Sequence, residues 1–166
     1  QQTSIKRMLA YSSIAHAGYM LLAMPVMSGD SIYAIMIYLV MYLFMNLGAF
    51  FVVIIVKNKT GGESFDDYKG LGWEMPFVGA AMTLFMVSLT GLPPTAGFIG
   101  KFYIFASLIK GGGAYYWLVL AGGINSVISL YYYLRVVKVM YFDGERKEKI
   151  LLPSKVLTWM LVVTAF

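Results

Sequence analysis

The sequence predicts an all-α polytopic membrane protein, a helix bundle in which one transmembrane helix is discontinuous. The first observation is the composition: of 166 residues, 60% are hydrophobic and 13% are charged, with a mean hydropathy of +0.73. Soluble domains carry about 25% charged residues and about 45–50% apolar ones. The second observation is a series of apolar runs of span length, and the third is a cluster of prolines and glycines inside one of them.

The apolar runs predict the spans in order along the chain. A helix needs about 20 mostly apolar residues to cross about 30 Å of hydrocarbon. Such runs predict spans over residues 8–27, 32–56, 75–109, 114–139 and 153–166, the last one incomplete. The polar loop 57–74 contains "ESFDDY", which suits a short helix at the membrane surface. Because the chain starts at Gln1 and its last apolar run is unfinished, we expect it to be a piece of a larger protein.

The run 75–109 is too long for one straight helix. Two adjacent prolines and three glycines interrupt it: Pro93, Pro94, Gly91, Gly97 and Gly100. The prolines lack backbone donors and the glycines permit non-helical dihedrals, so we predict a break near 91–97. Discontinuous helices beside a charge recur in the ion pathways of transporters. The alternative is a simple proline kink that aids packing.

The basic residues favour one broken span over two complete spans. With one broken span, eleven of the thirteen basic residues lie on the same side of the membrane: Lys6, Arg7, Lys57, Lys59, Lys69, Arg135, Lys138, Arg146, Lys147, Lys149 and Lys155. With two spans this bias would largely vanish. The positive-inside rule therefore predicts one broken span, and this basic side faces the cytoplasm or the mitochondrial matrix.

Several classes of site are excluded by the residues present. Without cysteine the chain has no disulfide, thiolate nucleophile or iron–sulfur ligand, and one histidine with few carboxylates makes no metal-ligand cluster. There is no nucleotide fingerprint or flavin motif. The net charge of +5 comes from residues at the ends of apolar runs, which marks membrane orientation and not a nucleic-acid partner.

Three polar residues at membrane depth are candidates for proton relay. Lys101 lies about 13 Å from the end of its span at 1.5 Å per residue, too deep to carry its charge easily to the interface. Removal from water disfavours the charged amine, so such a lysine can exchange a proton near neutral pH. His16 and Tyr42 lie near the centres of the first and second spans. Their alternative roles are a hydrogen-bonded packing histidine and interhelical hydrogen bonding.

Aromatic triplets stand near opposite ends of the fourth span. They are Tyr115–Trp117 and Tyr131–Tyr133. Amphipathic rings gather at membrane interfaces, so both triplets are predicted to be interfacial anchors and not ligand sites.

Four consecutive stretches resemble a known family. "QTSIKRMLAYSSIAHAGYMLL", "YLFMNLGAFFVV", "LTGLPPTAGFIGKFYIF" and "ISLYYYLRVVKVMY" are similar to the antiporter-like membrane subunits of proton-pumping NADH:quinone oxidoreductase, respiratory complex I. The chain most resembles the N-type subunit, called subunit 2 in mitochondria. The resemblance covers nearly the whole chain, and "GFIGKF" and "IKRMLAYSS" are its most specific parts.

The resemblance implies particular positions for the family's proton path. The chain would be the C-terminal part of a subunit of about fourteen helices, beginning at the end of the ninth. The last lysine of the path, within "GKF" on the discontinuous twelfth helix, falls on Lys101. Sister subunits carry a histidine on the eleventh helix where this chain has Tyr42, which is a departure. The family's glutamate–lysine pair and central lysine would lie upstream of Gln1, so this chain would hold at most half of a pathway.

The implied function is proton translocation as a multi-pass subunit of the bacterial or mitochondrial inner membrane. Its partners would be the lipid bilayer, protons and the other membrane subunits of complex I. NADH, flavin, iron–sulfur clusters and quinone would belong to other subunits, so the chain would be part of an enzyme without holding its redox site. One alternative is a subunit of a multisubunit Na⁺/H⁺ antiporter or a membrane-bound hydrogenase. Another is a non-conducting structural subunit, in which Lys101 would be charged against a fixed carboxylate.

Overall fold

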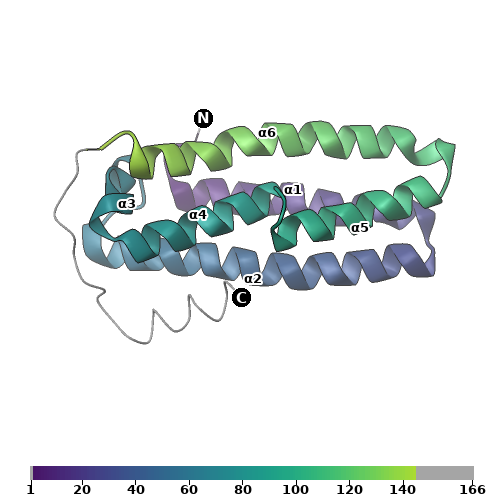
Figure 1. The fold of residues 1–166 in the computed structure, drawn as a ribbon, viewed down its shortest axis with the longest axis horizontal. Coiled ribbons are helices and arrows are strands. Elements are labelled where there is room, and N and C mark those ends of the chain that lie inside the picture. The colour runs from purple at the N-terminus through teal and green to yellow at the C-terminus, as the bar shows by residue number, and fades with distance from the viewer. Residues whose placement is uncertain (1, 145–166) are drawn as a thin grey trace.

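Long helices run side by side along one axis (Figure 1). The computed structural model describes residues 2–144, and all regular elements in this range are helical. The α-helices are α1 (Ile5–Ala23), α2 (Gly29–Thr60), α3 (Leu71–Glu74), α4 (Pro76–Thr90), α5 (Ala96–Lys110) and α6 (Tyr116–Tyr141). Short 3-10 helices are η1 (Met24–Val26), η2 (Phe65–Tyr68) and η3 (Gly113–Tyr115). The all-α prediction is confirmed, while the span predicted over 153–166 lies outside the described residues.

Within residues 2–144, three continuous helical segments are long and apolar enough to cross a membrane. They are Ile5–Val26, Gly29–Thr60 and Gly113–Tyr141. The helices α4 and α5 have 15 residues each, or about 22 Å at 1.5 Å per residue, which is short of the roughly 30 Å of hydrocarbon. Figure 1 shows α4 and α5 following one another beside α2. Together they provide the length of one interrupted span, packed against α1, α2 and α6.

The segment between α2 and α4 closes one end of the bundle. Helix α2 extends into the predicted loop as far as Thr60 and ends at Gly61, whose φ of 78° is in the left-handed region. The stretch Phe65–Glu74 then meets α4 at an angle of 118°. Its Trp73 indole donates a hydrogen bond of 2.9 Å to the carbonyl of Tyr141, the last residue of α6. This segment therefore ties the ends of the spans together.

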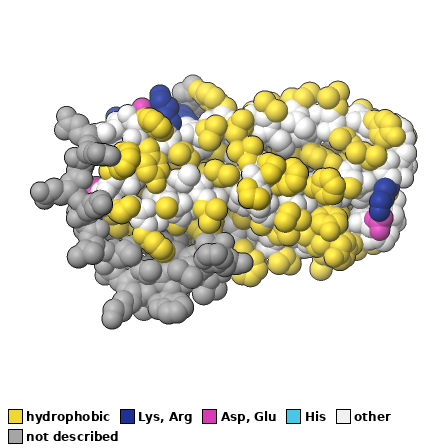
Figure 2. Space-filling model, viewed as in Figure 1, with side chains coloured by type: hydrophobic (Ala, Val, Ile, Leu, Met, Phe, Trp, Pro, Cys, Tyr) yellow, Lys and Arg dark blue, Asp and Glu magenta, His cyan; other side chains and the backbone are white. Residues whose placement is uncertain are grey.

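Charged side chains gather at the two ends of the bundle, as Figure 2 shows for one face. At the basic side, Glu63 pairs with both Lys6 and Lys57, at 3.4 and 2.6 Å. The hydrogen bonds from Lys57 and Lys6 hold the pKa of Glu63 below its usual value. At the opposite end Lys110 pairs with Asp30 at 2.7 Å. Large apolar side chains are exposed between these ends, among them Ile14, Leu120 and Val127, as a lipid-facing surface requires.

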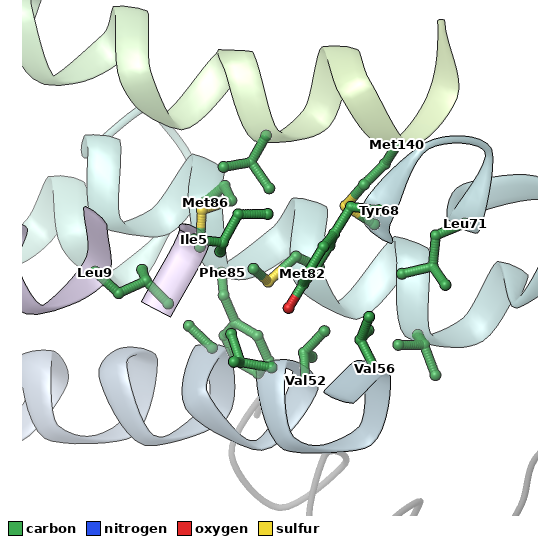
Figure 3. Packing of buried hydrophobic residues seen from close by; sticks show 14 of the residues in the cluster. Ile5, Leu9, Val52, Val56, Tyr68, Leu71, Met82, Phe85, Met86 and Met140 are labelled. Atoms are coloured by element: carbon green, nitrogen blue, oxygen red, sulfur yellow. The ribbon is translucent and has the colours of Figure 1, made fainter. Parts of the chain in front are cut away.

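Among the described residues, the larger of two buried apolar clusters lies near the basic side, and Figure 3 shows part of its packing. It joins residues of α1, α2, α4 and α6, among them Leu9, Val52, Phe85, Met86 and Met140. Tyr68 reaches into this cluster from η2 and is fully buried. Its hydroxyl has no hydrogen-bond partner among residues 2–144. A buried hydroxyl without a partner has lost its hydrogen bonds to water and makes no hydrogen bond within the protein in their place.

Replacing Tyr68 with phenylalanine should stabilise the protein. The change removes the unpaired hydroxyl and keeps the ring, so we expect a gain of about 1 kcal/mol in the free energy of unfolding. Thermal unfolding of the purified membrane complex, followed by the loss of this subunit, measures the effect. Tyr11→Phe is the control, because Tyr11 is 58% exposed and its variant should unfold like the wild type. A lower unfolding temperature for Tyr68→Phe would contradict the prediction.

Candidate functional site

The break between α4 and α5 leaves two backbone carbonyls without their helical donors. Helix α4 ends at Thr90, where Gly91 adopts a left-handed φ of 84°. In a continuous helix the carbonyls of Leu89 and Thr90 would accept from the amides four residues later. Those residues are Pro93 and Pro94, joined by a cis peptide bond, and proline has no N–H. The C-terminal end of α4 thus presents two acceptors in a buried place.

Lys101 of α5 satisfies these acceptors. Its Nζ donates to the Thr90 carbonyl at 2.7 Å and lies 3.4 Å from the Leu89 carbonyl. The side chain is 5% exposed, so it turns toward the break and does not reach for an interface. The C-terminal end of a helix also carries partial negative charge, which favours a cation there. Lys101 and the break therefore form one unit.

Two further groups complete the surroundings of the ammonium. Nζ lies 3.3 Å from the Ser126 hydroxyl of α6 and 4.5 Å from the centroid of the Tyr19 ring of α1. A cation over an aromatic face is attracted by the ring quadrupole. No ion pair within residues 2–144 includes Lys101. In this part of the chain the positive charge of Lys101 is stabilised by two carbonyls, a hydroxyl and an aromatic ring, and no carboxylate is paired with it.

The glycines of the motif serve different purposes. Gly91 ends α4 and leaves room for Lys101, since an added Cβ would lie 2.9 Å from the lysine Cδ. Gly97 and Gly100 lie inside α5 in regular helix, so the predicted non-helical role is wrong for both, and the break covers residues 91–95. They are needed for close packing. A Cβ on Gly97 would lie 1.7 Å from the Ser88 carbonyl oxygen, and one on Gly100 would lie 2.7 Å from the Tyr38 ring.

His16 is buried between two tyrosine hydroxyls. Its Nδ1 lies 2.7 Å from the Tyr38 hydroxyl and its Nε2 lies 3.0 Å from the Tyr133 hydroxyl. In a neutral imidazole one nitrogen donates and the other accepts, so one tyrosine hydroxyl accepts a hydrogen bond from His16 and the other donates one to it. Tyr42 stacks on the imidazole with 4.7 Å between ring centroids. The structure thus brings both predicted residues together, with Tyr42 in ring contact.

Sequence reasoning missed Tyr38 and Tyr133. Tyr133 is fully buried while Tyr131 is 68% exposed, so the interfacial-anchor interpretation is wrong for Tyr133. Tyr133 follows Ser126 and Ser129 at spacings of seven and four residues, which places all three on one helical face. Tyr38 precedes Tyr42 by one turn in the same way. These helical spacings could have shown from the sequence that Tyr38 and Tyr133 share a face with other polar residues.

Tyr19 connects the lysine and the histidine. Its hydroxyl lies 2.8 Å from the Ser126 hydroxyl. Its ring carries the Lys101 ammonium and meets His16 edge-on at 5.9 Å between centroids. The described residues therefore hold one buried cluster built from α1, α2, α5 and α6, in which the Tyr19 ring joins the groups around Lys101 to those around His16. Within them, no group of three or more histidines and carboxylates is placed to hold a metal ion.

Comparison with known proteins agrees with the predicted resemblance. Residues 1–129 match the family model described as NADH:quinone oxidoreductase/Mrp antiporter, TM. The chain is 59% identical over 151 residues to NADH-quinone oxidoreductase subunit N 2 of Sorangium cellulosum (strain So ce56), covering 89% of this chain and 30% of that protein. It is 56% identical over 140 residues to NADH-quinone oxidoreductase subunit N of Chlorobium chlorochromatii (strain CaD3), covering 84% and 27%.

A solved structure shows the same arrangement of helices. A chain of respiratory complex I from Thermus thermophilus with bound aureothin matches with a TM-score of 0.79 and 31% identity, covering 99% of this chain and 37% of that one. The predicted resemblance to N-type antiporter-like subunits is confirmed. The chain spans about a third of the length of these proteins.

Replacing Gly97 with alanine should disrupt the junction of α4 and α5. The added Cβ would overlap the Ser88 carbonyl oxygen, and overpacking of this kind costs about 1–3 kcal/mol. We expect lower thermal stability and less assembled subunit in the membrane. Gly123→Ala is the matched control, because an added Cβ at that helical glycine meets no atom within 4 Å. Equal stability of the two variants would show that the close approach is not needed.

Proposed function

Because this chain belongs to the NADH:quinone oxidoreductase/Mrp antiporter transmembrane family, we propose that it forms the C-terminal part of an N-type subunit that translocates protons in a membrane-bound NADH:quinone oxidoreductase. Lys101 is the group that gains and loses the proton. The observation that carries this proposal is the burial of Lys101 against the free carbonyls of Leu89 and Thr90, with no carboxylate paired to it within residues 2–144.

The surroundings of Lys101 suit a charge that changes. A buried ion pair would hold the lysine protonated, because separating it leaves an uncompensated charge. Carbonyl dipoles, a hydroxyl and a ring stabilise the ammonium more weakly and remain compatible with the neutral amine. A charge placed nearby by another part of the complex can therefore shift the balance between the two forms. Such a shift links proton release at Lys101 to changes of charge in other parts of the complex.

His16 and Tyr42 take supporting roles in this proposal. His16 has a hydroxyl partner on each ring nitrogen, so it can accept a proton at one nitrogen and release one at the other. Tyr42 contacts the imidazole through its ring. Its place in the relay is to orient His16 between Tyr38 and Tyr133.

The redox chemistry belongs to other subunits in this proposal. NADH, flavin, iron–sulfur clusters and quinone would be bound there, and the partners of this chain would be membrane subunits of the same complex in an inner membrane. A subunit of a Na⁺/H⁺ antiporter or of a membrane-bound hydrogenase is the alternative within the family. The identity of 59% to an N subunit favours the oxidoreductase.

Replacing Lys101 with glutamine or arginine in the full complex tests the proposal. Glutamine removes the titrating amine, while arginine keeps the positive charge and cannot release its proton. We expect both variants to lower proton pumping per NADH oxidised by about tenfold or more, because general acid–base groups contribute at least that much to proton transfer. Pumping is measured as fluorescence quenching of a pH-sensitive dye in inverted membrane vesicles.

The control is Lys110→Gln, since Lys110 is exposed and paired with Asp30 at the opposite end. It should assemble and pump like the wild type. Normal pumping by the assembled Lys101→Arg variant would show that the residue acts as a fixed charge, and the proposal would fall.

A further inference from the structure

We propose that Ser88 is a positioning residue for Lys101: its hydroxyl caps the N-terminal end of α5 and so keeps the lysine against the end of α4. The cap is the hydrogen bond of 3.3 Å that the Gly97 amide donates to the Ser88 hydroxyl. Ser88 is 5% exposed and lies in the last turn of α4. This role rests on the proposed function, since it concerns the same lysine, and it falls on a residue that the sequence did not single out.

The N-terminal end of α5 needs an acceptor from outside its own helix. The first amides of a helix have no partner within it, and a side chain at the N-cap position usually supplies one. Thr95 occupies that position in α5 and makes no such bond. Its hydroxyl donates to the Leu92 carbonyl instead. The buried Gly97 amide would therefore be unpaired without Ser88, which is costly at membrane depth.

The Ser88 hydroxyl is oriented differently from other hydroxyls in the long helices. Those commonly donate to a carbonyl three or four residues earlier in their own helix, as do Ser12, Thr83, Thr90, Ser107 and Ser129. The Ser88 hydroxyl donates to the Met45 sulfur of α2. A thioether has no proton to donate, so the direction of this hydrogen bond is fixed. The lone pairs of the Ser88 oxygen remain available for the Gly97 amide.

Gly97 allows the three helices to meet at this point. An added Cβ on Gly97 would lie 1.7 Å from the Ser88 carbonyl oxygen and 3.3 Å from the Met45 sulfur. Only a residue without a side chain can bring the start of α5 so close to α4 and α2. The cap and the close approach therefore depend on the same contact.

Two contacts join α4 and α5 in opposite directions. Ser88 of α4 accepts from Gly97 at the start of α5, and Lys101 of α5 donates to the Thr90 carbonyl at the end of α4. Lys101 follows Gly97 by four residues, one helical turn, so both lie on the same face of α5. Each contact shortens the distance that the other has to span. The two broken ends thus cap one another.

The two caps respond differently to a change of charge. When Lys101 loses its proton, its bonds to the α4 carbonyls lose the strength that the positive charge gives them. The bond between Ser88 and Gly97 includes no titrating group and stays the same. Ser88 can therefore keep α5 in place while the lysine is neutral, so that the amine regains its proton beside the same carbonyls.

The titratable groups around Lys101 come from α1, α2 and α6. Tyr19 is in direct contact with the ammonium and His16 interacts with it electrostatically. The hydroxyl partners of His16 follow, which are Tyr38 and Tyr133. Within residues 2–144, Ser88 hydrogen-bonds to none of these groups, since its partners are Met45 and Gly97. A change at Ser88 therefore acts on Lys101 through the position of α5.

The test is the pH dependence of proton pumping by Ser88→Ala in the full complex. Without the cap, the start of α5 can move away from α4, and an ammonium farther from the carbonyls is stabilised less relative to the neutral amine. We expect the pH above which pumping falls to move downward by about one unit, which corresponds to a proton held about tenfold less tightly. Pumping per NADH oxidised is measured in inverted membrane vesicles over a series of pH values.

Met45→Leu is a second variant that leaves the serine in place. Leucine has nearly the volume of methionine but cannot accept a hydrogen bond, so the Ser88 hydroxyl loses the partner that orients it. The pH profile should move in the same direction as in Ser88→Ala, by a smaller amount. Ser107→Ala is the matched control, because Ser107 is buried in α5 and donates to the Ile104 carbonyl of its own helix. Its profile should be that of the wild type.

The outcomes separate this role from the proposed function. A wild-type pH profile in Ser88→Ala, or in Met45→Leu where the first variant does not assemble, would overturn the positioning role. Pumping lowered in equal proportion at every pH would also overturn it, since that is the effect of a residue that supports only the fold. If Lys101→Gln still loses pumping in either case, the proposed function stands. If Lys101→Gln pumps like the wild type, the proposed function and the positioning role both fall.

Discussion

The carbonyls of Leu89 and Thr90 end α4 in the interior of the bundle, and the residues four positions later are prolines. An unpaired carbonyl in a low-dielectric interior is costly, and no water of the bilayer core can relieve it. The protein meets this cost with the Lys101 ammonium, whose own burial would otherwise be just as unfavourable. Two groups that are each expensive at membrane depth therefore stabilise one another.

Much of the surrounding structure follows from this contact. Lys101 reaches the end of α4 because Gly97 lets α5 begin directly against the Ser88 carbonyl, and Gly100 lets α5 lie against Tyr38 of α2. The remaining sides of the ammonium are covered by α1 and α6 through Tyr19 and Ser126. The broken span is consequently enclosed by the other long helices. Its lysine stays away from lipid while carrying no fixed counter-ion among the described residues.

The contrast with the ends of the bundle supports a functional role for this lysine. There, lysines pair with carboxylates, as Lys57 does with Glu63 and Lys110 with Asp30. Ion pairs of that kind hold a charge in place. At Lys101 the partners are dipoles and hydroxyls, which stabilise the ammonium without excluding the neutral amine. A group of this kind can take part in a proton path, whereas the paired lysines serve to anchor and orient the spans.

The sequence by itself determined the all-α membrane fold and the interruption of one of its helices beside Lys101. These features depend on composition, on run length and on the chemistry of proline, which act locally along the chain. It also predicted His16 as a candidate, because a lone histidine in an apolar run stands out before its partners are known. The prediction of non-helical dihedrals at Gly97 and Gly100 was wrong, because the sequence does not show whether a glycine supplies unusual dihedrals or allows a close approach.

Only the tertiary structure decided which groups surround the lysine and the histidine. Tyr19, Tyr38, Ser126 and Tyr133 come from three different helices, and each looked like an ordinary packing or interfacial residue in its own segment. Whether a tyrosine faces lipid or an imidazole depends on the rotation of its helix against the neighbouring ones. That rotation is set by contacts between distant parts of the chain, such as Gly100 with Tyr38, and local sequence patterns do not contain it.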